Sequence, residues 1–131
     1  MKVSGNAIVL TNGKFDTKSA KTAHGLIRGS KRFIIKSVID DKFHAKYVHS
    51  NKHGNVFMSS TESDIPVFKN VESFLEAGID VNYCIIGVAS AGGILPKEMR
   101  NDVILALNNN ISIVNGLHSI LNYDSQLKKI A

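Results

Sequence analysis

Short apolar runs recur along the chain, and each run is bounded by polar or turn-forming residues. The runs cover residues 6–10, 33–40, 65–68, 83–89 and 111–116. They are rich in β-branched side chains and apolar throughout, a pattern typical of strands that are buried on both faces. The sequence therefore predicts five strands of a parallel sheet.

Helix-period segments separate these runs. Helices are expected over residues 19–28, over residues 71–77, after Pro96, and over residues 118–130. Asn70 is a candidate N-cap for the second helix, and Gly78 is its stop. The helix after Pro96 stacks Met99, Val103 and Leu107 on one face.

Strands that alternate with helices predict an α/β fold with a three-layer α/β/α architecture. Right-handed crossovers favour a Rossmann-like, doubly wound parallel sheet of five strands in the order 3-2-1-4-5. The segment 41–64 is polar and irregular, and it has no place in this scheme.

Composition adds limits on the class of protein. A chain of 131 residues with 44% hydrophobic and 21% charged residues is expected to form one globular domain. It contains neither an apolar run long enough for a membrane span nor a signal peptide, which predicts a cytoplasmic location without membrane partners. The single cysteine, Cys84, lies in an apolar run and is expected to behave as a small buried hydrophobe.

The net charge of +5 is modest. The lysines are scattered and no basic run is interleaved with aromatic residues, so nucleic acid is not the expected partner. A small anionic ligand explains the same positive excess.

In a doubly wound sheet, ligands bind beyond the carboxyl ends of the strands, where the winding direction changes. Two loops rich in small residues meet at that point in this scheme, and a helix that begins near Ser19 would direct free N–H groups at an anion. The candidate ligand-binding residues are Asn12, Gly13, Lys14, Lys21, Thr22, Asp40, Ser90, Gly92, Gly93 and His118. Alternatives stay open for several of them: Lys21 is either a phosphate ligand or a surface lysine, Asp40 either holds a ribose or is a solvated strand end, and His118 either lines the site or caps the last helix.

The motifs of the well-known phosphate-binding loops are incomplete. Gly13 stands well before Lys21 and no glycine directly precedes that lysine, so the pattern is not a P-loop, and a G-x-G-x-x-G fingerprint is absent. His44, His49 and His53 form a spaced series without a cysteine or carboxylate at ligand spacing, and no metal site is expected.

Three ordered blocks, "GKFDTKSAKTAHGLIRGS", "IIGVASAGGILP" and "ISIVNGLHSIL", carry a family resemblance. They resemble the N-terminal Rossmann-like domain of the D-glutamate N-acetyltransferase-like family, over Ala7 to about Ile130. The resemblance implies a longer protein whose C-terminal P-loop domain is a partner of this one. It also implies a homo-oligomer, and acetyl-CoA or a nucleotide as a ligand of the full-length protein.

Two functional hypotheses follow. In the first, the chain is a fragment of a D-glutamate or D-aspartate N-acetyltransferase-like protein, where it contributes to a ligand cleft and does not catalyse alone. In the second, it is a stand-alone nucleotide- or dinucleotide-binding regulatory module. The missing dinucleotide fingerprint argues against the second hypothesis. The absence of a grouped acid, base and nucleophile argues against an independent enzyme.

Overall fold

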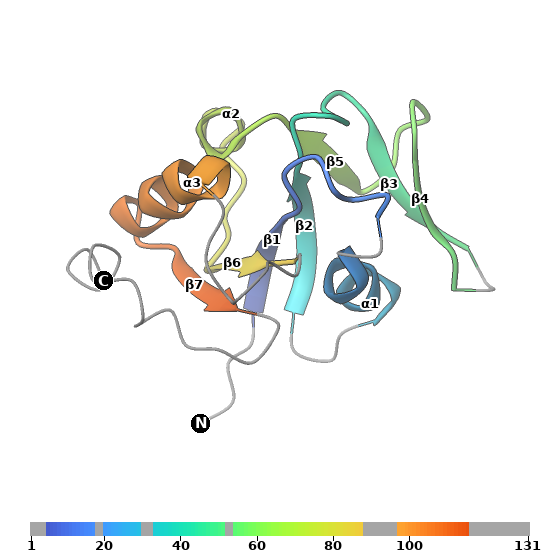
Figure 1. Cartoon of the computed structure of the whole chain (residues 1–131), viewed down its shortest axis with the longest axis horizontal. Helices are drawn as coiled ribbons and strands as arrows, with labels where there is room; N and C mark the ends of the chain where they lie inside the picture. The colour runs from blue at the N-terminus through green and yellow to red at the C-terminus, as the bar shows by residue number, and fades with distance from the viewer. Residues whose placement is uncertain (1–4, 18–19, 30–32, 52–53, 88–96, 116–131) are drawn as a thin grey trace.

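A computed structural model gives the structure of the chain, and it describes residues 5–17, 20–29, 33–51, 54–87 and 97–115 (Figure 1). The predicted last helix at 118–130 lies outside these residues. Each of the five predicted apolar runs forms a strand of the sheet, in agreement with their β-branched composition.

The described part of the chain forms one seven-stranded mixed sheet in the order β4-β3-β5-β2-β1-β6-β7. The strands are β1 (Gly5–Leu10), β2 (Phe33–Ile39), β3 (Tyr47–Ser50), β4 (Val56–Ser59), β5 (Ile65–Phe68), β6 (Tyr83–Ile86) and β7 (Ser112–Asn115). The strands β5, β2, β1, β6 and β7 pair in parallel, whereas β3 pairs antiparallel with both β5 and β4. The Rossmann-like α/β class with a mostly parallel sheet is therefore confirmed.

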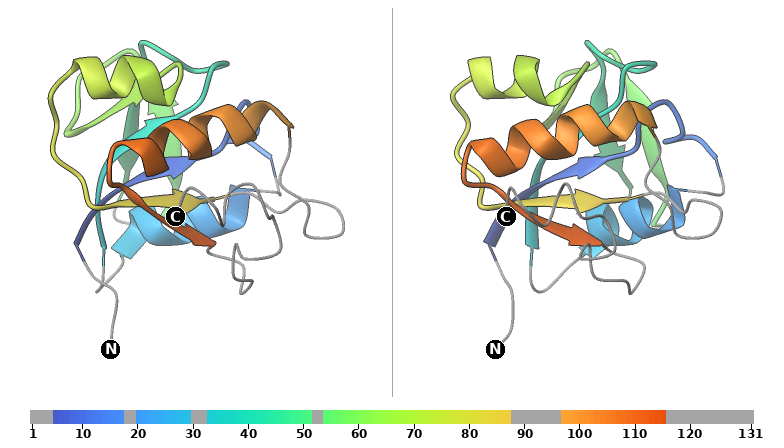
Figure 2. Two further views of the ribbon diagram at one scale, coloured as in Figure 1. Left: turned by 90° about the vertical axis from the view of Figure 1, so that its left-hand side faces the viewer. Right: turned by 60° about the vertical axis from the view of Figure 1, so that its left-hand side comes forward.

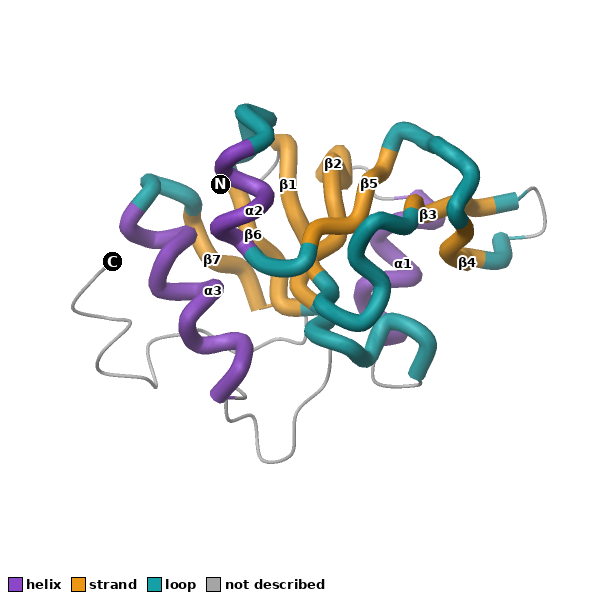
Figure 3. The backbone as a smooth tube through the Cα atoms, turned by 90° about the horizontal axis from the view of Figure 1, so that it is seen from above, coloured by secondary structure: helices purple, strands orange, loops and turns teal. Residues whose placement is uncertain are grey.

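The prediction of a purely parallel five-stranded sheet was wrong. The unplaced segment 41–64 forms the hairpin β3–β4, which extends the sheet beyond β5 in place of a crossover helix between β2 and β5. Where the two strands meet, the Asn51 N–H donates to the Asn55 carbonyl at 3.0 Å. Seen from above, the hairpin lies at the opposite end of the sheet from β7 (Figure 3).

The helices cover both faces of the sheet. They are α1 (Lys21–Gly29), α2 (Val71–Glu76) and α3 (Lys97–Asn108), and α1 lies on one face while α2 and α3 lie on the other (Figure 2). The Asn70 side chain accepts a hydrogen bond from the Ser73 N–H at 2.8 Å, which confirms its role as the N-cap of α2. None of the described helices is long and apolar enough to cross a bilayer.

The core is built around β1, whose last four residues Ala7 to Leu10 are fully buried between the two helical layers. On the α3 face, Met99 and Val103 are also fully buried, as their spacing predicted. A second apolar cluster joins the hairpin to the α1 face of the sheet through Phe15, Val38, Val48 and Val67. The hairpin is thus packed onto the domain and also extends its sheet.

Candidate functional site

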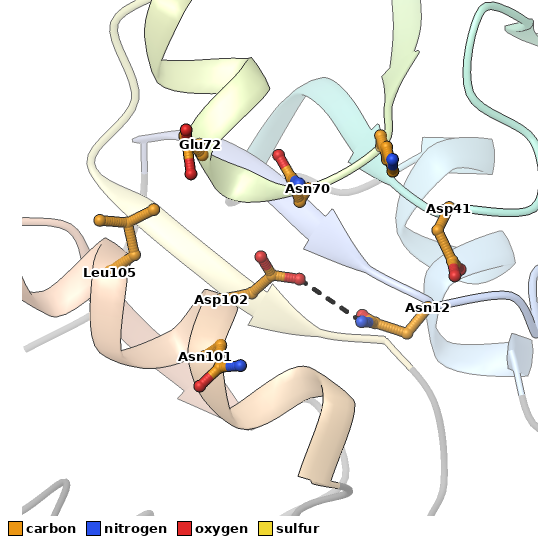
Figure 4. Close-up of a pocket in the computed structure, with 8 residues that line it drawn as sticks. Asn12, Asp41, Asn70, Glu72, Asn101, Asp102 and Leu105 are labelled. Atoms are coloured by element: carbon orange, nitrogen blue, oxygen red, sulfur yellow. Dashed lines mark hydrogen bonds between the residues drawn. The ribbon is translucent and has the colours of Figure 1, made fainter.

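A cavity of about 380 Å³ opens at the carboxyl edge of the sheet, on the face covered by α2 and α3 (Figure 4). The segments just after β1, β2 and β5 supply part of its wall, and the start of α2 together with the second and third turns of α3 supplies the rest. The lining residues are Asn12, Asp41, Lys69, Asn70, Glu72, Asn101, Asp102 and Leu105. The predicted ligand edge of the sheet therefore carries a cavity, and most of its lining side chains are polar.

Asp102 is the most buried ionisable group of this cavity. It lies in α3 with only 8% of its surface exposed, and its Oδ1 accepts the Val71 N–H at 3.0 Å. Burial raises the pKa of Asp102, the nearby charge of Asp41 raises it further, and hydrogen bonds from Val71 and Asn12 oppose the shift. Because the Val71 N–H lies in the first turn of α2, this carboxylate joins the two helices at the cavity.

Asn12 reaches the cavity from a tight turn after β1. The turn is closed by the Lys14 N–H, which donates to the Thr11 carbonyl at 2.9 Å, and it has positive φ at both central residues, Asn12 (41°) and Gly13 (86°). Asparagine and glycine tolerate this conformation better than other residues. Asn12 Nδ2 donates to Asp102 Oδ2 over a long 3.4 Å, and its Oδ1 is buried without a hydrogen-bond donor among the described residues.

Asp40 closes a neighbouring loop and does not line the cavity. Its carboxylate is fully buried and accepts the Thr11 hydroxyl at 2.6 Å, the Phe15 N–H at 3.3 Å and the Lys42 N–H at 3.0 Å. These bonds fix the loop after β1 to the end of β2. The next residue, Asp41, lines the cavity instead, so Asp40 as a ribose-binding residue stays a prediction without support from this geometry.

Of the other predicted site residues, those that the structure describes do not line the cavity. Gly13 shapes the turn beside Asp41, whereas Lys14 and Lys21 are exposed. The side chain of Thr22 lies outside the described residues, as do Ser90, Gly92, Gly93 and His118 in full. Among the ten candidates, Asn12 is the one that the described residues place in the cavity wall.

The expected anion site at the start of α1 is partly used by the protein itself. The Ala23 N–H, in the first turn of α1, donates to the Gly87 carbonyl at 3.3 Å. This bond satisfies one of the N–H groups that a helix start would offer to an anion. The anionic ligand at this loop stays a prediction.

Sequence reasoning missed Asp102, although a signal for it exists. It follows Met99 by three residues and precedes Ala106 by four, so it falls on the buried stripe of α3. A carboxylate on an apolar helical stripe is rarely buried without a partner, and this position is therefore unusual enough to mark a site. Asn70 was identified as a cap, and the cavity adds a second role to it.

The cysteine and the histidines that the structure describes lie outside the cavity. Burial raises the pKa of the Cys84 thiol, and the charge of Asp102 adds to the effect, so Cys84 is held as a neutral thiol inside the core. His49 stacks on Phe57 with ring centroids 5.3 Å apart and contacts the Thr61 carbonyl at 2.9 Å. His44 is exposed and His53 lies outside the described residues, and no group of three potential metal ligands occurs in the part of the chain that the structure describes.

Comparisons with known proteins show which family the chain is similar to. Residues 49–131 match the family model described as "Domain of unknown function (DUF1611_N) Rossmann-like domain". The chain is also similar to the crystal structure of a DUF1611 family protein from Anabaena variabilis ATCC 29413, with 26% sequence identity and a TM-score of 0.72. That alignment covers 97% of this chain and 34% of the cyanobacterial protein, so the chain spans about one third of the length of its relative. None of the curated proteins matches the sequence.

Proposed function

Because this chain belongs to the DUF1611_N family of Rossmann-like N-terminal domains, we propose that it works as the ligand-cleft domain of a longer protein. That protein resembles the D-glutamate or D-aspartate N-acetyltransferases, and its C-terminal P-loop domain and self-association belong to the same proposal. The domain helps to bind a substrate or cofactor, and it does not transfer an acetyl group alone.

The cavity at the carboxyl edge of the sheet carries this proposal. It brings the buried carboxylate of Asp102 and the amide of Asn12 together from elements 90 positions apart in the sequence. A polar cavity at the strand ends is the usual ligand position in such sheets. Buried polar groups that are incompletely satisfied are costly for stability, which is expected where a ligand supplies the missing partners.

Acetyl transfer requires an acyl donor, a positioned amine and a base to take its proton, all held in a narrow geometry. The cavity has one buried carboxylate, that of Asp102, and no paired nucleophile among the described residues that line it, which supports a contributing role over independent catalysis. We expect purified residues 1–131 to form no N-acetyl-D-glutamate from acetyl-CoA.

The decisive test uses the longer protein, obtained by reading the coding sequence downstream of Ala131. We expect an in-frame continuation that encodes a P-loop, and D-glutamate acetylation by its product. Asn12→Ala should raise KM by about tenfold, because a cavity hydrogen bond is lost, whereas the exposed Asp80→Asn should leave the kinetics unchanged. Robust acetylation by residues 1–131 alone, or no acetylation by the longer protein, would refute the proposal.

A stand-alone nucleotide-binding module is the second candidate. The observation that favours it is the carboxylate of Asp41, which lines the cavity just beyond the end of β2, where a ribose-binding acid stands in dinucleotide-binding sheets. Titration of residues 1–131 with adenosine and with ATP separates the two functions, because this module should bind both through the ribose, and Asp41→Asn should remove that binding.

A further inference from the structure

The charge of the cavity differs from the charge of the whole chain. The chain carries a net +5, yet among the described residues three carboxyl groups line the cavity, from Asp41, Glu72 and Asp102, against the one ammonium of Lys69. A wall of this kind repels anions and attracts cations. The anionic ligand expected from the overall charge is therefore a poor fit to this cavity.

The hydrogen-bonding capacity of the wall points in the same direction. Asn12 Oδ1 is a buried acceptor without a donor among the described residues. Asp102 is more than nine-tenths buried, and among the described residues each of its oxygens has one donor, the Oδ2 bond being long at 3.4 Å. An ionised carboxylate can accept about four hydrogen bonds, so acceptor positions remain open next to an orphaned amide oxygen.

We propose that this cavity is a subsite for the primary ammonium group of a small amine. An ammonium group brings three N–H donors and no acceptor, which complements the open acceptors of Asn12 and Asp102. Its charge also offsets the cost of holding the Asp102 carboxylate away from water. The exposed carboxylates of Asp41 and Glu72 at the rim steer the cation inward.

This inference rests on the proposed function only in taking the cavity as a ligand site, and it does not depend on acetyl transfer. Loss of acetylation in the longer protein would leave ammonium binding by residues 1–131 untouched. Conversely, if the longer protein acetylates D-glutamate but the cavity does not bind amines, the subsite is refuted and the proposed function still stands.

The test is an NMR titration of residues 1–131 in low salt, following the side-chain amide signals of Asn12. Ethanolamine is the cationic probe, glycine the zwitterion, and acetate the anion. We expect ethanolamine to bind with a Kd of about 1–10 mM, a realistic value for four heavy atoms. Glycine should bind at least about fivefold more weakly, and acetate should leave the Asn12 signals unchanged.

Matched variants locate the effect. Asp102→Asn and Asp41→Asn should each weaken ethanolamine binding by about fivefold or more, because each removes one carboxylate from the wall. Asp80→Asn makes the same charge change in the exposed α2–β6 loop and should leave the Kd unchanged. Asp41 is exposed, so its variant remains informative if Asp102→Asn fails to fold. Binding of acetate as tight as that of ethanolamine, equal weakening by all three variants, or no binding of ethanolamine would overturn the inference.

Discussion

Replacing Gly87 by alanine should destabilise the domain through a clash at the centre of the fold. Gly87 directly follows β6, and its N–H donates to the Leu10 carbonyl at 3.0 Å while its carbonyl accepts the Ala23 N–H at 3.3 Å. These two bonds bring α1 close to the strands β1 and β6. The close approach leaves no space for a side chain at residue 87.

The size of the effect follows from the distances that an added Cβ would have. It would lie 2.4 Å from Val9 Cγ1, 2.9 Å from Ala23 Cβ and 3.3 Å from the Leu10 carbonyl oxygen. Val9 and Ala23 are fully buried, so neither can move into open space. Overpacking of a filled core costs about 1–3 kcal/mol, and we expect the upper part of that range, about 2–3 kcal/mol, because two of the three distances fall below 3.0 Å.

Thermal unfolding followed by circular dichroism measures this change. For a domain of this size the loss corresponds to a melting temperature lower by about 8–12 °C. Gly25→Ala is the matched control, because the nearest atom to its added Cβ is Arg28 Nη2 at 3.8 Å. Alanine there should stabilise α1 by up to about 1 kcal/mol. A Gly87→Ala protein as stable as the original chain would refute the packing argument.

Three further changes probe the caps and carboxylates around the cavity. Asn70→Ala removes the bond to the Ser73 N–H and should cost about 1 kcal/mol in urea unfolding, while Asn70→Ser should keep most of the stability. Asp40→Asn places an NH₂ group against the donors that now meet a carboxylate oxygen, so it should lower the free energy of unfolding by about 1–3 kcal/mol in the same assay. An unchanged urea midpoint would contradict the role of Asp40 in fixing the loop after β1 to the end of β2. Burial raises the pKa of Asp102 above its ordinary 3.8, so the folded state favours the protonated carboxyl. The stability that this carboxyl contributes is therefore fully present below pH 3.8 and is lost as the pH rises through the raised pKa. Urea unfolding at a series of pH values should therefore show the stability of the original chain falling relative to Asp102→Asn as the pH rises; a constant difference would mean that the carboxyl of Asp102 is not perturbed.

Much of the sheet could be predicted because strands that are buried on both faces appear in the sequence as apolar runs. The apolar runs at β1, β2 and β5 have few polar interruptions, and their boundaries in the structure differ from the predicted ones by one residue or less. The Asn70 cap was equally readable, since its side chain acts on the backbone three residues away. Local chemistry was sufficient in both cases.

The hairpin could not be read in the same way. The strands β3 and β4 have only four residues each and a mixture of buried, partly buried and exposed positions, so no apolar run marks them. Their burial comes from the second apolar cluster, which depends on Phe15 and Val67 from elsewhere in the chain. A turn signal at Asn51–Asn55 was present, but the turn alone does not fix the edge to which the hairpin pairs.

The site was the least predictable part because it depends on contacts distant in sequence. The cavity brings together the ends of three strands, the start of α2 and the middle of α3, and no short motif spans these segments. Asn12 was identified from its loop alone. The predicted residue Asp40 and its neighbour Asp41 differ by one position: Asp40 is buried and holds the loop, whereas Asp41 is exposed on the cavity wall.

The hairpin β3–β4 that replaces a crossover helix should also be less stable against local opening than the rest of the sheet. Its ladder to the rest of the sheet consists of two residue pairs, Tyr47 with Pro66 and Val48 with Ile65, and is extended by the Val67 N–H, which donates to the Lys46 carbonyl at 3.0 Å. By contrast, β1 is flanked by parallel partners along both of its edges. Strands held by so few bonds open at a lower free energy than the global unfolding of the domain. The amides of β4 should therefore exchange with solvent through local opening, while those of β1 exchange only when the whole sheet unfolds. The cavity is anchored to the strands of the slow-exchanging part, so we expect that the hairpin edge can vary or carry an insertion without disturbing the cavity.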